Sequence, residues 1–181
     1  MDAGFSVELS EDDPTLAVPW RSPEGAITYM DLKQYPELMD GLSEVRKFPE
    51  LGAFLRTLNA PDSPFETAKC DAWFDTLMDV DDEPFEAAMK CSCYVDLFLS
   101  GERKRTKFAE QEASARMVAQ RLRETNDVAA RVEIILRRAY FADWTGFYWT
   151  VYVFGYGDGV DSARSSWQSA LRLLQTALLE A

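Results

Sequence analysis

The sequence predicts a mainly α protein of the α+β class, with about five to seven helices packed around a small antiparallel sheet. Apolar residues recur at helical spacing through much of residues 31–142 and again in 161–180. Short alternating runs supply the strands, so the expected sheet is formed by N-terminal strands and residues 146–154. The chain has 181 residues, of which 47% are hydrophobic, and we expect a single globular domain over residues 1–181.

The N-terminal segment, residues 1–30, is expected to form short edge strands or to wrap irregularly. Apolar and polar side chains alternate in two short runs, Phe5–Leu9 and Ala26–Met30. Proline cannot donate to a strand ladder and is confined to edges and loops. The prolines between the two runs therefore limit the length of any strand here: Pro14, Pro19 and Pro23.

Residues 31–142 are expected to be helical. Proline favours the first position of a helix, and Pro36, Pro49 and Pro84 each precede an apolar run. Ser63 and Glu66 flank Pro64 with the spacing of a capping box, which predicts another helix start. The expected helices span approximately 36–46, 49–59, 63–78, 84–99, 102–125 and 128–142.

Residues 145–155 form an aromatic segment that we interpret as a strand. Nine of the 23 aromatic residues lie between Tyr140 and Tyr156, and β-branched residues are interspersed among them. A helical period would instead place Phe147, Val151 and Phe154 on one face, so a buried helix is the alternative. The segment leads into a C-terminal helix over 161–180, whose apolar residues form a single stripe.

The composition excludes several kinds of chemistry. The chain has no histidine, which rules out Ser-His-Asp and Cys-His catalysis and His-ligated zinc within the chain. Its three cysteines are an odd number, and Cys91 and Cys93 would point to roughly opposite faces of the expected helix. We interpret them as small buried hydrophobes, and no cofactor is expected.

Charge is divided unevenly along the chain, and this bears on its partners. Residues 1–100 carry 21 acidic and 7 basic side chains, whereas residues 101–181 carry 10 and 12. We expect the Arg-rich helices to lie against the acidic half, in the same chain or in a partner subunit. Nucleic acid is not expected as a partner, because the overall net charge is −12. No signal peptide or apolar run of membrane length is present, which predicts a cytoplasmic protein without a membrane contact.

Two sets of residues near the aromatic segment are candidates for ligand binding. A small molecule could contact the segment 140–156 through a tyrosine, arginine and aspartate set, with a solid aromatic core as the alternative: Tyr148, Tyr152, Tyr156, Arg137, Arg138 and Asp143. The turn that follows could hold an anion on its backbone N–H groups, although its glycine spacing does not match the dinucleotide-binding pattern: Gly155, Gly157, Gly159 and Arg164.

Acidic pairs spaced by three residues are candidates for a magnesium site. This spacing places two carboxylates on the same side of a helix, as in helical nucleotide hydrolases. The pairs are Glu83 with Glu86 and Glu124 with Asp127, and pairs at this spacing also recur elsewhere in this acidic chain.

These observations favour a non-catalytic interaction module that self-associates, with a homodimer expected. The absence of histidine, the segregated charge and the many large apolar residues support this prediction. The alternatives are a small-molecule-binding protein or enzyme with its pocket at the aromatic segment, and a magnesium-dependent nucleotide hydrolase. An acidic decoy that competes with nucleic acid for a basic protein is a further alternative.

Overall fold

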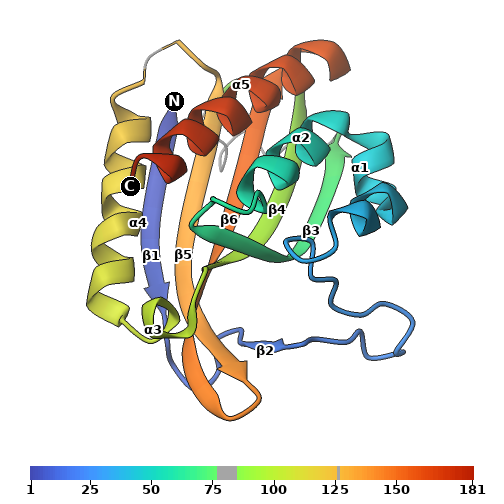
Figure 1. Cartoon of the computed structure of the whole chain (residues 1–181). Helices are drawn as coiled ribbons and strands as arrows, with labels where there is room; N and C mark the ends of the chain where they lie inside the picture. The colour runs from blue at the N-terminus through green and yellow to red at the C-terminus, as the bar shows by residue number, and fades with distance from the viewer. Residues whose placement is uncertain (77–84, 126) are drawn as a thin grey trace.

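The computed structural model describes residues 1–76, 85–125 and 127–181. Within these residues, six strands form one mixed sheet, and helices pack on one of its faces (Figure 1). The elements in chain order are β1 (Asp2–Glu8), β2 (Leu16–Val18), the 3-10 helix η1 (Pro36–Gly41), α1 (Ser43–Lys47), α2 (Pro49–Leu58), β3 (Phe65–Asp75), β4 (Met89–Leu99), α3 (Glu102–Arg105), α4 (Phe108–Arg123), β5 (Ala130–Phe141), β6 (Trp144–Gly157) and α5 (Val160–Leu179).

The sheet has the strand order β1-β5-β6-β4-β3, and β2 also pairs with β5. Its centre is antiparallel, because β6 pairs in that sense with both β4 and β5. β5 and β6 form a long hairpin in which Phe141 pairs with Trp144 across a two-residue turn. β1 and β2 run parallel to β5, so the N-terminal segment extends the sheet beyond this hairpin.

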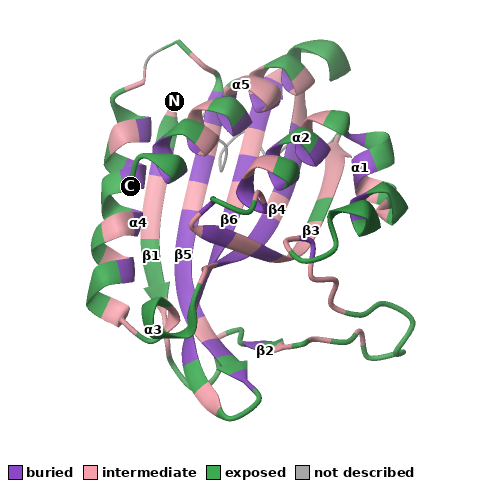
Figure 2. Cartoon of the chain, in the orientation of Figure 1, coloured by how far each residue is buried: buried purple, intermediate pink, exposed green. Residues whose placement is uncertain are grey.

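The main core lies between the sheet and its helices. α5 crosses β6 and β4, with α2 on one side of it and α4 on the other (Figure 1). The helix approaches β6 so closely that a Cβ atom on Gly155 would lie 2.1 Å from the backbone N of Trp167. In Figure 2 the central strands and the sheet-facing sides of these helices are largely buried. Glycine at this position therefore allows the backbone of α5 at Trp167 to pack directly on the sheet.

The expectation of a mainly α protein with a small antiparallel sheet is wrong: the molecule is an α+β protein dominated by a six-stranded mixed sheet. Three of the segments expected to be helical contain the strands β3, β4 and β5. Cys91 and Cys93 lie on the same face of β4, fully buried, rather than on opposite faces of a helix. Short apolar runs fit both periods, and pairing with distant strands decides between them.

The aromatic segment was assigned correctly, because β6 is a strand that contains it. Its partners differ from the expectation, since β6 pairs with β4 and β5 rather than with N-terminal strands. The second N-terminal run forms only an isolated bridge, between Arg21 and Thr28. The helices expected at 49–59, 102–125 and 161–180 correspond to α2, to α4 with α3, and to α5.

Candidate functional site

The two faces of the sheet carry different side chains. On β6, Trp149, Val151 and Val153 belong to the core under the helices. The alternate residues of β6 and their cross-strand partners on β4 point to the opposite face, on which no helix packs within the described residues. We call this side the helix-free face.

The lower end of the helix-free face, near the turn between β5 and β6, is closed by the N-terminal segment. A second hydrophobic cluster forms there, in which Leu16 is buried against Phe98 and Tyr148. Trp20 fixes the segment in place, because its indole Nε1 donates to the carbonyl oxygen of Ala68 at 2.9 Å. This end of the face is therefore a small core of its own.

A row of polar side chains crosses the middle of the helix-free face. Arg137 Nε donates to Glu8 Oε2 at 2.8 Å, which links β5 to β1. Arg137 Nη1 donates to Thr150 Oγ1 at 2.9 Å, and that hydroxyl donates to Asp96 Oδ1 at 2.7 Å. The four side chains connect β1, β5, β6 and β4, and we call them the polar row.

Burial affects the pKa values of the ionisable side chains in the polar row. It raises the pKa of Asp96 to about 6, although the hydrogen bond from Thr150 and the charges of Lys69 and Arg137 act in the opposite direction. Burial works against the charged form of Arg137, but hydrogen bonds to Glu8 and Tyr152 together with the charge of Glu8 outweigh this effect and raise the pKa of Arg137. The row therefore pairs a carboxylate that is costly to ionise with a guanidinium that stays charged.

The upper end of the helix-free face carries aromatic rings without a covering element among the described residues. The rings of Tyr94 and Tyr152 lie 5.9 Å apart, and those of Tyr152 and Phe154 are parallel at 6.1 Å. Trp73 belongs to the same cross-strand row as Phe154, since both pair with Ser92. We call these four residues, each partly exposed, the aromatic platform.

The predicted small-molecule residues fall into different environments. Arg137 and Tyr148 are buried in the middle and lower parts of the helix-free face, and Tyr152 lies on the platform. Tyr156 is buried against Phe85, with ring centroids 4.9 Å apart. The other two residues are away from these rings: Arg138 donates to the carbonyl of Leu9, and Asp143 is exposed in the turn between β5 and β6.

The glycines of the predicted anion site pack against α5 or cap its first turn. Gly155 and Gly157 lie directly against that helix, where a Cβ on Gly157 would be 2.5 Å from the backbone N of Ala163. Gly159 caps the helix, and its N–H donates to Ser162 Oγ at 3.1 Å. Arg164 instead donates to Glu50 through Nε and Nη2, at 2.9 and 2.8 Å. These glycines serve helix docking rather than an open loop.

The predicted metal ligands that lie within the described residues do not form a cluster. Glu83 lies outside the described residues, and Glu86 is exposed just before β4. Glu124 and Asp127 are exposed in the connection between α4 and β5. Across residues 1–76, 85–125 and 127–181, no group of three or more His, Cys, Asp or Glu side chains could hold a metal ion.

The cysteines are poorly suited to nucleophilic chemistry. Burial raises the pKa values of Cys70 and Cys91 to about 12, and it raises that of Cys93 as well. The thiolate is the reactive form of cysteine, and a raised pKa leaves almost none of it at neutral pH.

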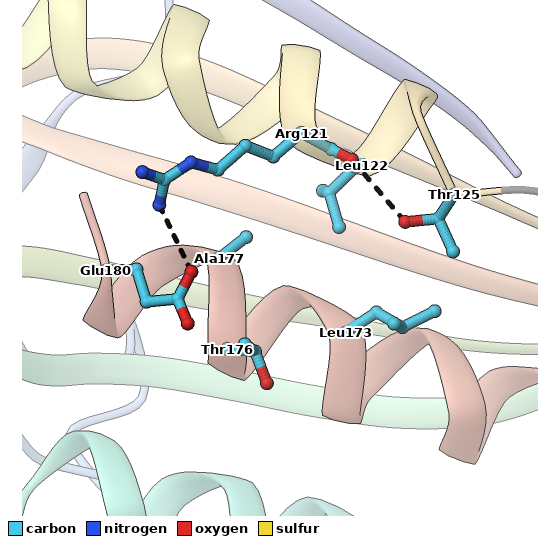
Figure 3. A pocket seen from close by; sticks show the side chains of 7 residues that line it. All are labelled: Arg121, Leu122, Thr125, Leu173, Thr176, Ala177 and Glu180. Atoms are coloured by element: carbon cyan, nitrogen blue, oxygen red, sulfur yellow. Dashed lines mark hydrogen bonds and ion pairs between the residues drawn. The ribbon is translucent and has the colours of Figure 1, made fainter.

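A groove of about 280 Å³ lies between the C-terminal ends of α4 and α5 (Figure 3). Figure 3 shows Arg121 reaching from α4 toward Glu180, with Nη1 3.6 Å from Oε2. Thr125, Leu173 and Thr176 complete much of its wall. The ligand residues predicted from the sequence do not line this groove.

Sequence reasoning missed most of the helix-free face, including Glu8, Asp96 and Thr150. It also missed Trp73 and Tyr94, which it assigned to a helix and did not consider as ligand residues. The alternation in 89–99, with polar or aromatic residues at even positions and apolar ones at most odd positions, could have revealed the site.

Comparisons of the chain with models of protein families, with curated proteins and with solved structures find no match. A separate observation concerns membranes: none of the helices in the described part of the chain combines the length and the apolar character needed to cross one.

Proposed function

We propose that this chain is a non-catalytic interaction module that binds a protein partner through the aromatic platform. The observation that carries this proposal is the contact between Tyr94, Tyr152 and Phe154 on a sheet face over which no helix of the described residues packs. Tyrosine, tryptophan and phenylalanine are the side chains that contribute most to binding at the centres of protein interfaces. The platform supplies them on adjacent strands.

The polar row beside the platform supports this proposal, because its hydrogen bond from Thr150 to Asp96 joins the two strands that carry Tyr152 and Tyr94. Thr150 and Asp96 pair across β6 and β4, directly beside the pair of Tyr152 and Tyr94. A surface that is already ordered loses less side-chain entropy on binding. The flanking charges are of both signs, with Lys90 5.4 Å from the Phe154 ring and Asp71 exposed opposite Tyr94. Such a rim suits a polypeptide better than a phosphate backbone.

The non-catalytic assignment is supported by the chemistry of the described side chains. Burial raises the pKa values of the three thiols, which favours their protonated form, and the chain has no histidine to act as a base. We also propose a cytoplasmic location, because free cysteines suit a reducing compartment.

Site-specific photo-crosslinking in cells that express the protein tests the proposal. A benzophenone amino acid at Tyr152 should give a covalent adduct with another protein, identified by mass spectrometry. The matched control replaces Tyr140, which is also on the β5–β6 hairpin and 44% exposed but lies outside the platform. An adduct at Tyr152 that disappears in a Phe154→Ser background supports the proposal. Equal adducts at both positions, or none at Tyr152, would overturn it.

A further inference from the structure

The outer edge of β3 is the least protected edge of the sheet. At the lower end, Asn59 Oδ1 accepts the N–H of Thr67 at 3.1 Å, so a side chain occupies the edge there. Farther up, the N–H of Ala72 is satisfied only locally, by Oδ1 of its neighbour Asp71 at 2.7 Å. A strand edge with outward N–H and C=O groups is a template for another strand.

The opposite edge of the sheet is guarded differently. α4 lies alongside β1 (Figure 1), and Arg123 Nε donates to the carbonyl oxygen of Ala3 at 2.6 Å. The amino group of Met1 also donates to the carbonyl oxygen of Thr125 at 2.9 Å. Strand addition at β1 would have to displace these contacts, whereas among the described residues the N–H of Ala72 on β3 is bonded to the side chain of its own neighbour Asp71.

We propose that a second copy of this chain adds to β3 in the antiparallel sense, about a two-fold axis that passes through Ala72. In this register the two Ala72 residues face each other and exchange their N–H and C=O groups. Lys69 of each copy then lies opposite Asp75 of the other, and Asp71 lies opposite Trp73. The axis is perpendicular to the sheet, so the helix-free faces of both copies lie on the same side.

Charge complementarity selects this register over its neighbours. A shift of two residues in one direction places Asp71 opposite Asp71 of the other copy. The same shift in the other direction places Asp71 opposite Asp75 twice. Like charges directly opposite each other destabilise a strand pair, whereas opposite charges stabilise it. Of these three registers, only the centred one places Lys69 opposite a carboxylate, and it keeps Asp71 away from other acidic side chains by placing it opposite Trp73.

The side chains that would meet share one face of β3, and Lys69 Nζ, which lies 4.7 Å from the centroid of the Trp20 ring, turns toward the edge in the dimer. Lys69, Asp71, Trp73 and Asp75 all lie on the helix-free face, as their pairing with residues of β4 shows. Asp75 Oδ2 already accepts from Trp73 Nε1 at 3.1 Å and from Ser92 Oγ at 3.2 Å, and an ionised carboxylate has capacity for another donor. Within one chain, Lys69 and Asp75 are six residues apart on one strand, about 20 Å, so they cannot pair.

The dimer would join two sheets into one and bring the two aromatic platforms to the same side. Trp73 of each copy then stands beside Asp71 of the other, at the centre of the joined surface. This interface uses the edge of β3 and shares Trp73 with the aromatic platform, whereas the ring contacts that carry the partner proposal lie on β6 and β4. Either proposal can therefore fail without the other.

A charge swap followed by analytical ultracentrifugation tests the dimer. Lys69→Asp places two carboxylates opposite each other at both ends of the interface and should weaken dimerisation about tenfold or more. Asp75→Lys should weaken it similarly, and the double variant Lys69→Asp/Asp75→Lys should restore it. Asp143→Lys, in the exposed turn between β5 and β6, is the matched control and should leave the dimer unchanged. Thermal unfolding of each variant shows whether its fold is intact.

Cross-linking through cysteine supplies a second measurement that does not depend on charge. Cα atoms of a hydrogen-bonded antiparallel pair lie about 5.5 Å apart, within the range that a disulfide spans. Ala72→Cys should therefore give a covalent dimer under mild oxidation, and Lys69→Cys, about 20 Å from its counterpart, should not. A strictly monomeric wild type, or a double charge swap that fails to restore the dimer although it is folded, would overturn the dimer. Adducts at Tyr152 in a monomeric protein would leave the interaction module standing.

Discussion

The two faces of the central sheet use alternate residues of the same strands for opposite purposes. Toward the helices, β6 contributes Trp149, Val151 and Val153 to a core so close-packed that Gly155 has no space for a Cβ. Toward the other side, it contributes Thr150 to the polar row and Tyr152 and Phe154 to the aromatic platform. Because neighbouring residues on a strand point to opposite faces, stability and recognition are encoded at alternate positions of one segment.

The largest loss of stability is expected from a substitution on the helix-covered face, at Trp167. Trp167 lies on α5 where the helix contacts Gly155, its indole is fully buried, and its ring centroid is 5.7 Å from that of Phe48. Trp167→Ala leaves a cavity that the backbone of the sheet cannot fill, and it should lower the free energy of unfolding by about 3–5 kcal/mol. Urea denaturation measures the loss. Met117→Ala, on the exposed side of α4, should cost less than about 1 kcal/mol, and an equal cost would contradict the comparison.

The next largest effect is expected in the polar row, at Thr150. Thr150→Val keeps the shape of the side chain but removes the hydroxyl that links Arg137 to Asp96. Two buried charged groups then lose a partner, so we expect a loss of about 1–3 kcal/mol in urea denaturation. Thr145→Val on the exposed part of the same strand is the control and should change stability by less than about 0.5 kcal/mol. Equal effects of the two substitutions would show that the hydroxyl link is not structural.

The polar row should also give a pH dependence of defined sign. Burial raises the pKa of Asp96 from its ordinary 3.8 to about 6, so between these values the folded chain holds a proton that the unfolded chain has released. The contribution of Asp96 to the free energy of unfolding therefore falls as pH rises through this window, by about 1.4 kcal/mol for each unit of the raised pKa. Above pH 6 the cost of the buried charge is fully present.

Asp96→Asn isolates this contribution, because its amide oxygen can still accept the Thr150 hydroxyl while carrying no charge. Unfolding free energies of wild type and variant should be compared at about pH 4.5 and about pH 7.5, since the difference cancels the titration of the other carboxylates. The free energy of unfolding of the variant, relative to that of the wild type, should increase as pH rises. A difference that is the same at both pH values would show that Asp96 titrates near its ordinary pKa.

The sequence carried enough information for some elements but not for the sheet as a whole. α5 was predictable because its apolar stripe has no competing interpretation over 20 residues, and β6 because its aromatic and β-branched residues favour a strand. β3 was mistaken for a helix because Cys70, Trp73 and Phe74 match helical spacing equally well. In the structure, Cys70 and Phe74 pack against the core and Trp73 faces away from it.

The candidate site could not be predicted because it exists only through long-range pairing. Glu8 and Arg137 are 129 positions apart in sequence, and Thr150 and Asp96 are 54 apart. No local pattern specifies such partners. Once β4 is recognised as a strand, however, the alternation in 89–99 places Tyr94 and Asp96 on one face, and only the strand order remains to be found.

The smallest effect on stability is expected on the aromatic platform, and a pair of adjacent residues tests it most directly. Val153→Thr introduces a hydroxyl into the buried core, where it lacks a hydrogen-bond partner, and should cost about 1–3 kcal/mol. Phe154→Thr, one residue further along β6, exposes the same hydroxyl to water and should cost about 1 kcal/mol or less. It should nevertheless abolish the crosslink from Tyr152, whereas Val153→Thr should retain it wherever the chain is folded. If Phe154→Thr costs as much as Val153→Thr and leaves the crosslink intact, the aromatic rings serve the fold rather than recognition, and the two faces would not differ in purpose.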